Sequence, residues 1–278
     1  MIRLIACDLD ETLLDDEKQI SKENKDAIRK ARDEYGVLFV PASGRGYLGI
    51  TAVMKELDVF DKANEYTISN NGGIVIENKD YRPIVFHSFC FDIAERLFQY
   101  GIQLGLCIQV FTETQVYAFH LDDEERKWLY MFKPDAVDSK DKSIAFLKEE
   151  PIIKILFALP DMGALRAIAH RMDQEGVLQG VSHSFSSNRY LELNPIGVHK
   201  GVGLKELAAY LQIDLSETMA IGDNDNDIEM LKTAGLSVAV ANANAHIQEI
   251  ADAVTKQDYK HSAVSEAIHR FVFQEEGA

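Results

Sequence analysis

Short apolar runs alternate with amphipathic helices at both ends of the chain. The runs at 4–7 and 37–40 are separated by a segment whose apolar residues recur at helical spacing, and similar runs return at 219–221 and 237–240. A short continuous apolar run indicates a strand buried on both faces. The strand–helix–strand order therefore predicts a parallel sheet with helices on its faces, and ligands in such folds bind beyond the carboxyl ends of the strands.

The middle of the chain has a different character. Aromatic residues cluster there, and the segments 106–111 and 115–120 have the pattern of an antiparallel hairpin. We expect these aromatic side chains to form a core rather than a ligand site, because sheet faces need large apolar residues. The predicted architecture is an α/β, doubly wound, Rossmann-like core formed by 1–84 and 192–278, interrupted by an inserted α+β cap domain at 85–191.

Four groups of polar residues follow the strands of the alternating region or begin one of its helices. Because the ends of parallel strands meet in one crevice, we expect these groups to build a single site although they are far apart in the sequence. The four groups are Asp8-Leu9-Asp10-Glu11-Thr12, Ser43-Gly44-Arg45, Lys200-Gly201 and Gly222-Asp223-Asn224-Asp225-Asn226-Asp227.

The residue types in these groups suit a phosphate and a hard cation. Ser43 offers a hydroxyl, Gly44 an amide that an anion can approach closely, and Lys200 a positive charge at a helix N-terminus. Carboxylates prefer Mg²⁺ to softer metals, and a cation between them and a phosphate removes their mutual repulsion. The carboxylates in question are Asp8, Asp10 and Asp223.

Each of these residues also has an ordinary structural interpretation. Ser43 alone is typical of a loop or a helix cap, and Lys200 alone is typical of a solvated helix start. The acidic run at 223–227 can cap the helix that follows it, and Arg45 can pair with any surplus carboxylate. The joint occurrence of all four groups favours the single site.

With these four motifs in this order, the sequence resembles the haloacid dehalogenase superfamily, and within it the Cof-type hydrolases that carry a large cap of the IIB type and include bacterial sugar phosphatases. The resemblance extends from end to end. Supporting stretches are Asn71-Gly72, Leu191-Glu192-Leu193-Asn194-Pro195 and Gln257-Asp258-Tyr259-Lys260-His261-Ser262-Ala263-Val264.

The resemblance implies a role for each motif residue. Asp8 would be the nucleophile, and Asp10 would protonate the leaving group and then activate water. Mg²⁺ would be held by the carboxylates of Asp8 and Asp223 and by the backbone carbonyl of Asp10. The phosphoryl oxygens would be held by Ser43, Lys200, Asn226 and the amides of Leu9 and Gly44; supporting residues are Asp227, Thr12 and Arg45.

The implied function is a Mg²⁺-dependent phosphatase that hydrolyses small phosphorylated metabolites, in particular sugar phosphates, through an aspartyl phosphate. Two alternatives stay open: a sugar phosphomutase, and a phosphate-binding regulatory protein without turnover. Two positions depart from the family pattern. Position 11 is Glu where Gly is usual, and His199 precedes the lysine where Ser or Asn is common.

Composition limits the partners and the compartment. The 278-residue chain has a formal net charge of -16 and no block rich in Lys and Arg, which argues against nucleic acid. It has three cysteines without metal-like spacing and no apolar stretch of membrane-spanning length. We therefore expect a cytoplasmic protein, a monomer or small homo-oligomer, without a nucleic-acid or membrane partner.

Overall fold

The computed structural model describes residues 1–113, 115–132 and 135–275. The chain divides into two compact units. The core unit comprises Met1–Phe86 and His199–Ala278, and the inserted unit comprises His87–Val198. Each unit has its own sheet and its own buried apolar residues, as expected of an α/β core with a separate α+β insertion.

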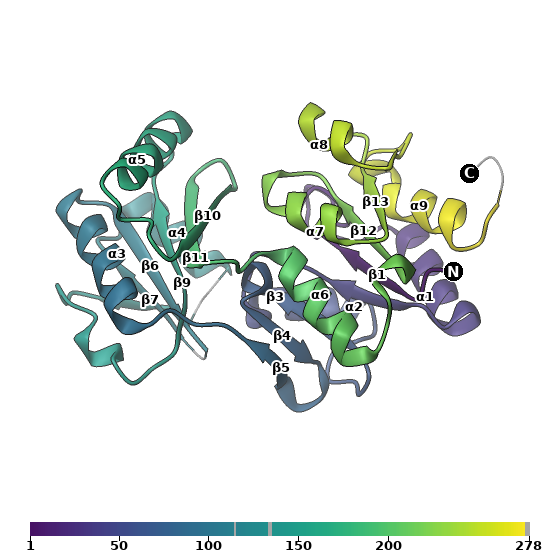
Figure 1. Ribbon diagram of the computed structural model, residues 1–278, viewed down its shortest axis with the longest axis horizontal. Helices are drawn as coiled ribbons and strands as arrows, with labels where there is room; N and C mark the ends of the chain where they lie inside the picture. The colour runs from purple at the N-terminus through teal and green to yellow at the C-terminus, as the bar shows by residue number, and fades with distance from the viewer. Residues whose placement is uncertain (114, 133–134, 276–278) are drawn as a thin grey trace. The chain divides into compact units, whose positions relative to one another are not determined.

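A five-stranded parallel sheet forms the centre of the core unit, in the order β14-β13-β12-β1-β2. The interior strand β1 is buried along its whole length, and its first residue, Leu4, pairs with Thr218 on one side and Leu38 on the other. The early and late parts of the chain therefore lie side by side in one sheet (Figure 1). The strands are β1 Leu4–Cys7, β2 Leu38–Pro41, β12 Thr218–Gly222, β13 Leu236–Ala239 and β14 Ala253–Val254.

Local sequence signals mark both ends of α1 in the core unit. The side chain of Ser21 accepts a hydrogen bond from the Asn24 amide at the start of α1, and Gly36 ends that helix in the left-handed conformation. α1 packs on α9 and α6 packs on α7. The helices are α1 Lys22–Tyr35, α2 Thr51–Glu56, α6 Lys200–Leu211, α7 Ile228–Thr233, α8 Ala245–Ile250 and α9 Ala263–Phe271.

A second, antiparallel sheet of the core unit has the order β3-β4-β5, with β3 Tyr66–Ser69, β4 Ile74–Glu77 and β5 Arg82–Phe86. The pattern of the sequence predicts the first two strands and the turn between them. It does not predict β5, because Pro83 within a short run lowers the expectation of a strand. Pairing places β5 on the outer side of β4, at the edge of this sheet.

The inserted unit is built on a six-stranded sheet in the order β10-β11-β9-β6-β7-β8. Buried aromatic residues such as Phe98, Phe119 and Phe157 form its core together with α3 and α5, as expected from the aromatic cluster. The predicted hairpin is present as the antiparallel pair β6–β7. The elements are α3 Phe91–Gln103, β6 Cys107–Thr112, β7 Val116–Phe119, α4 Asp123–Phe132, β8 Val137–Ser139, β9 Ile152–Ala158, α5 Met162–Gln174, β10 Val181–Ser186 and β11 Tyr190–Pro195.

The second boundary between the units differs from the one expected from the sequence. The expected core segment begins at residue 192, whereas the structure divides the chain between Val198 and His199. The reason is that β11 continues through this region and pairs with β10 as far as Pro195, opposite Val181. The first boundary lies after Phe86 rather than after residue 84.

Over the described residues, none of the helices combines the length and the apolar character needed to cross a membrane.

Candidate active site

Three of the four polar groups meet at the carboxyl ends of β1 and β12. Asp8 directly follows β1, and its amide donates a hydrogen bond of 2.9 Å to the carbonyl of Ile221 on β12. Lys200, the first residue of α6, donates from Nζ to Oδ1 of Asp8 and, at 2.6 Å, to Oδ1 of Asp227. Burial is nearly complete, with 0% exposure for Lys200 and Asp227 and 6% for Asp8.

Asp223 and Thr12 complete this buried cluster. Asp223 is 5% exposed, and its Oδ1 accepts a hydrogen bond of 2.7 Å from the hydroxyl of Thr12. Oδ2 of Asp227 accepts from the backbone amides of Asp223 and Asn224 at 3.1 and 3.2 Å. Asp227 therefore uses one oxygen to hold the lysine and the other to hold the turn that carries Asp223.

The cluster contains more negative than positive charge. Burial raises the pKa of Asp8, and the carboxylate of Asp227 raises it further despite the opposing effect of Lys200. Burial also raises the pKa of Asp223, with Asp8 and Asp227 adding to the effect. Burial alone would lower the pKa of Lys200, but these carboxylates outweigh it and raise that pKa. One ammonium does not balance three carboxylates.

A divalent cation fits this excess of negative charge. Oxygens of Asp8, Asp223 and Asp227 lie within 4.8 Å of one another, close enough to surround one ion. All the donors are hard carboxylate oxygens, which suits Mg²⁺ better than zinc. Because Asp227 already accepts hydrogen bonds on both oxygens, Asp8 and Asp223 are the better candidates for direct ligands.

Asp10 lies outside this buried cluster and is held by two cations. Arg45 donates to both of its carboxylate oxygens, through Nε to Oδ2 at 2.9 Å and through a terminal nitrogen to Oδ1. Lys18 donates to Oδ1 at 2.9 Å. Partial burial would raise the pKa of Asp10, but Arg45 and Lys18 together lower it, so these two cations favour the carboxylate form when no substrate is bound.

The loop after β2 is fixed by the turn that follows β3. The amide of Ser43 donates to the carbonyl of Ile68, while the carbonyl of Ser43 accepts from the amide of Asn71 at 3.0 Å. A Cβ at position 44 would stand 3.0 Å from Oδ1 of Asn71, so glycine allows the loop to lie against this side chain. Backbone hydrogen bonds on both sides of Ser43 thus hold the loop in place.

Of the two departures from the family pattern, the one at position 11 places a non-glycine residue in a strained conformation, and the one at position 199 has a local explanation. Glu11 has φ of 61°, in the left-handed region that glycine adopts without strain. His199 caps α6, because its Nδ1 accepts a hydrogen bond from the amide of Val202 at 3.2 Å. Burial lowers the pKa of His199, which keeps the imidazole neutral and able to accept. His199 therefore caps the helix in place of the Ser or Asn that is common at this position.

The remaining predicted residues lie on the same loops. Leu9 is fully buried, and its carbonyl accepts from the amides of Leu13 and Leu14 in the turn after β1. Asn226 is half-buried in the short turn before α7. Sequence reasoning missed Lys18 and Asn242, whose Nδ2 donates to the carbonyl of Glu11 at 2.8 Å. Polar residues in loops are too common to single these out.

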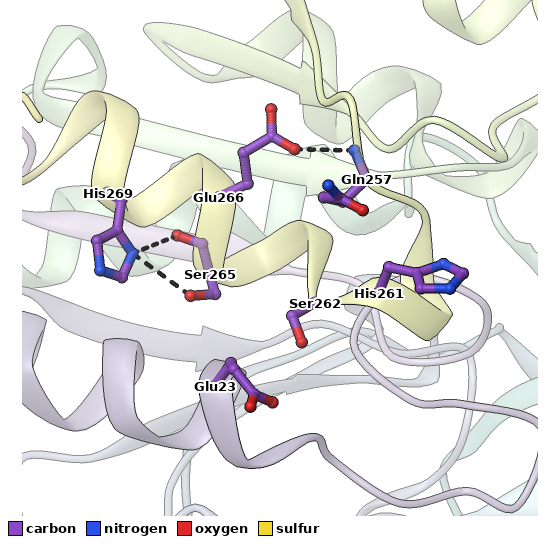
Figure 2. A pocket seen from close by; sticks show the side chains of 7 residues that line it. All are labelled: Glu23, Gln257, His261, Ser262, Ser265, Glu266 and His269. Atoms are coloured by element: carbon purple, nitrogen blue, oxygen red, sulfur yellow. Dashed lines mark hydrogen bonds between the residues drawn. The ribbon is translucent and has the colours of Figure 1, made fainter. Parts of the chain in front are cut away.

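A cavity of about 520 Å³ lies elsewhere in the core unit, beside the starts of α1 and α9 (Figure 2). Its lining includes Glu23, His261 and His269. None of the seven side chains drawn in Figure 2 belongs to the four polar groups, so we do not place the chemistry there.

Comparison with known proteins places this site in a family. The model of the haloacid dehalogenase-like hydrolases matches residues 5–268. The putative phosphatase YxeH of Bacillus subtilis is 28% identical over 284 residues, covering 98% of this chain and 99% of its own length. The 5-amino-6-(5-phospho-D-ribitylamino)uracil phosphatase YcsE of Bacillus subtilis is 28% identical over 273 residues, covering 98% of this chain and 96% of its own.

Comparison with solved structures indicates the same family. The crystal structure of a haloacid dehalogenase-like hydrolase from Bacteroides thetaiotaomicron superposes with a TM-score of 0.82 at 28% identity, covering 97% of this chain and 99% of that chain. The chain belongs to the haloacid dehalogenase-like hydrolase family, and it is an enzyme. The resemblance read from the four sequence motifs is confirmed.

Proposed function

We propose that the protein is a Mg²⁺-dependent phosphatase that hydrolyses small phosphorylated metabolites, in particular sugar phosphates, through an aspartyl phosphate on Asp8. The observation that carries this proposal is the buried Asp8 carboxylate, held by Lys200 next to Asp223 and Asp227. A carboxylate that only stabilised the fold would not need two further carboxylates beside it, since each adds repulsion in a buried place.

In the first step, an oxygen of Asp8 attacks phosphorus and the bond from phosphorus to the ester oxygen breaks. Lys200 fixes the attacking carboxylate through Oδ1 and offsets part of the charge on the phosphoryl oxygens. The amides of Leu9 and Gly44, the Ser43 hydroxyl and Asn226 hold the remaining phosphoryl oxygens. Asp10, when protonated, gives its proton to the leaving oxygen, which departs as an alcohol.

In the second step, Asp10 as a carboxylate removes a proton from water, and the water oxygen attacks the phosphorus of the aspartyl phosphate. Phosphate leaves and Asp8 is regenerated as a carboxylate. The ion pairs from Arg45 and Lys18 suit this second role, because they hold Asp10 ready to accept a proton. A Mg²⁺ ion bound by Asp8, Asp223 and the Asp10 carbonyl supplies positive charge that lets the phosphate approach these carboxylates.

We assign selection of the substrate to the inserted unit, as the cap of the enzyme. Its sheet carries buried polar pairs, including Lys154 with Glu192 at 3.3 Å and Gln109 with Glu125 at 2.9 Å. Burying such groups is costly, and functional sites are one place where proteins retain them. Several relatives are named phosphatases of a phosphorylated ribitylamino compound, so polyhydroxylated phosphate esters belong in any panel.

The test is release of inorganic phosphate from a panel of phosphate esters with Mg²⁺, ranked by kcat/KM. The panel contains sugar phosphates, sugar-alcohol phosphates and 4-nitrophenyl phosphate. Asp8→Asn should abolish turnover and leave the thermal unfolding midpoint close to that of the wild type, with Asp26→Asn on the exposed face of α1 as a matched control. Near-normal turnover by the Asp8 variant would refute the nucleophile assignment.

A further inference from the structure

Residues 11–20, here the Asp10 loop, lead from the catalytic aspartate to α1 and contact Asp10 again at their far end. The turn after Leu9 is followed by a small hairpin in which the Asp15 amide donates to the Gln19 carbonyl at 3.1 Å. From this hairpin Lys18 reaches Oδ1 of Asp10. Any displacement of the hairpin would therefore move a cation that touches the Asp10 carboxylate.

Residues 258–262, here the clamp segment, hold this loop near its middle and near its end. Tyr259 donates from its hydroxyl to Oδ1 of Asp16 at 2.6 Å, and Lys260 donates to the other oxygen of the same carboxylate. The hydroxyl of Ser262 lies 2.9 Å from the hydroxyl of Ser21, the residue that caps α1. The clamp segment thus contacts both the hairpin and the residue that follows it.

Asn242 joins the clamp segment to the start of the loop. Its Oδ1 accepts from the Tyr259 amide at 3.1 Å, and its Nδ2 donates to the Glu11 carbonyl at 2.8 Å. Glu11 directly follows Asp10, so the loop is tied to the same distant segment at the residue next to the proposed proton donor as well as at Asp16.

The backbone of the loop shows why it needs external support. Glu11 and Lys18 both have φ of 61°, and Ser262 in the clamp segment has φ of 66°. Non-glycine residues in this region carry strain, and they stay there only where surrounding contacts enforce it. On its other side the clamp segment borders the open cavity, which His261 and Ser262 line (Figure 2). Its position therefore depends on its polar contacts more than on apolar packing.

We propose that Tyr259, Lys260 and Asn242 are positioning residues, which hold the Asp10 loop so that Asp10 meets the leaving oxygen of the substrate. The inference rests on the proposed role of Asp10 as proton donor. The donor matters most when the leaving group is a poor one, such as an alkyl alcohol, and least for 4-nitrophenolate, which leaves without a proton. Loosening the loop should therefore affect the two kinds of ester unequally.

The experiment compares the wild type with the double variant Tyr259→Phe/Lys260→Met and with Asn242→Ala. For both variants we expect kcat/KM on an alkyl phosphate to fall about tenfold more than on 4-nitrophenyl phosphate. Lys79→Met is the matched control, because Lys79 forms a comparably exposed ion pair with Asp61 in the same unit. The Lys79→Met variant should have the wild-type kcat/KM on both esters. Equal losses on both esters would indicate a general structural effect and overturn the inference.

Hydrogen exchange supplies a second readout that does not depend on turnover. The amides of Asp15 and Lys18 make backbone hydrogen bonds within the loop, and the amide of Leu14 donates to Leu9 just before it. These three amides should exchange several-fold faster in the two variants than in the wild type or the Lys79 control. If the wild type hydrolysed neither ester, the proposed function would fail, and exchange would still decide whether the clamp segment orders the loop. Unchanged exchange in the variants would overturn the inference by itself.

Discussion

Arg45 contacts both carboxylate oxygens of Asp10, so a residue that follows β2 holds the proposed proton carrier that follows β1. Together with Lys18 it lowers the pKa of Asp10 and favours its ionised form. The two proposed carboxylates consequently differ by environment. Asp8 is buried among other carboxylates and its pKa is raised, whereas Asp10 lies among cations and its pKa is lowered.

The first prediction concerns pH. Arg45→Gln removes the strongest influence that lowers the pKa of Asp10, so that pKa should rise. Asp10 must be ionised to take a proton from water, so where hydrolysis of the aspartyl phosphate limits kcat, the acidic limb of the kcat–pH profile should move to higher pH, by about one unit. The measurement is kcat as a function of pH between pH 4 and 9. Arg82→Gln is the control, because it breaks a different arginine–carboxylate pair. If the acidic limb does not move, Arg45 does not control the ionisation of Asp10 during turnover.

A second prediction concerns the buried ion pairs. Lys200→Met leaves Asp8 and Asp227 buried without their cation, so the metal-free protein should lose about 3–5 kcal/mol of unfolding free energy. The further change Asp227→Asn should restore part of this loss, because an amide oxygen still accepts from the Asp223 amide but carries no charge. Urea unfolding without Mg²⁺ measures both. A double variant no more stable than the single one would contradict the electrostatic explanation.

Metal binding should release protons. Without a cation the pKa values of Asp8 and Asp223 are raised, and both carboxyls must be deprotonated to act as ligands. The apparent affinity for Mg²⁺ should therefore rise with pH through the range in which these groups titrate. Titration calorimetry in two buffers of different ionisation enthalpy gives the number of protons released. Asp223→Asn should weaken binding strongly, and an affinity independent of pH would show that the carboxyls are already ionised.

Position 11 offers a test of backbone strain. Glu11 adopts φ of 61°, which costs a non-glycine residue roughly 1–2 kcal/mol. Glu11→Gly should therefore stabilise the protein by up to about 1 kcal/mol after the larger entropy of the glycine-containing unfolded chain is subtracted. Glu11→Val should destabilise it, because a β-branched residue tolerates this region least. The urea midpoints of the two variants show whether each change stabilises or destabilises the protein. A destabilised Glu11→Gly variant would mean that the Glu11 side chain itself contributes to stability.

Much of the core unit follows from local patterns. The runs at 4–7 and 219–221 are apolar enough to be buried on both faces, and the residues after them had to meet once the strands paired in parallel. Ser21 and Gly36 mark the ends of α1 by their conformational preferences. The proximity of Asp8, Lys200 and Asp227 thus followed from the strand and helix ends.

Other features depend on tertiary contacts that no local pattern encodes. The pairing of Lys18 with Asp10 requires a hairpin whose register is set by the side chain of Asp15. The extension of the inserted unit to Val198 depends on pairing between β10 and β11. His199 as a helix cap is also hard to foresee, because imidazole can take this role only in its neutral form, which burial favours here.

The inserted unit leaves the core after β5 and returns immediately before α6, and these two elements contact each other in the core. Both ends of the insertion are therefore joined to core elements, β5 and α6, that lie next to each other. In evolutionary terms, such a segment can be replaced as a whole while the buried cluster of Asp8, Lys200 and Asp227 stays intact. Under the proposed assignment of substrate selection to the inserted unit, substrate preference can change through this one segment, provided that Lys200 still begins its helix two residues after the second junction.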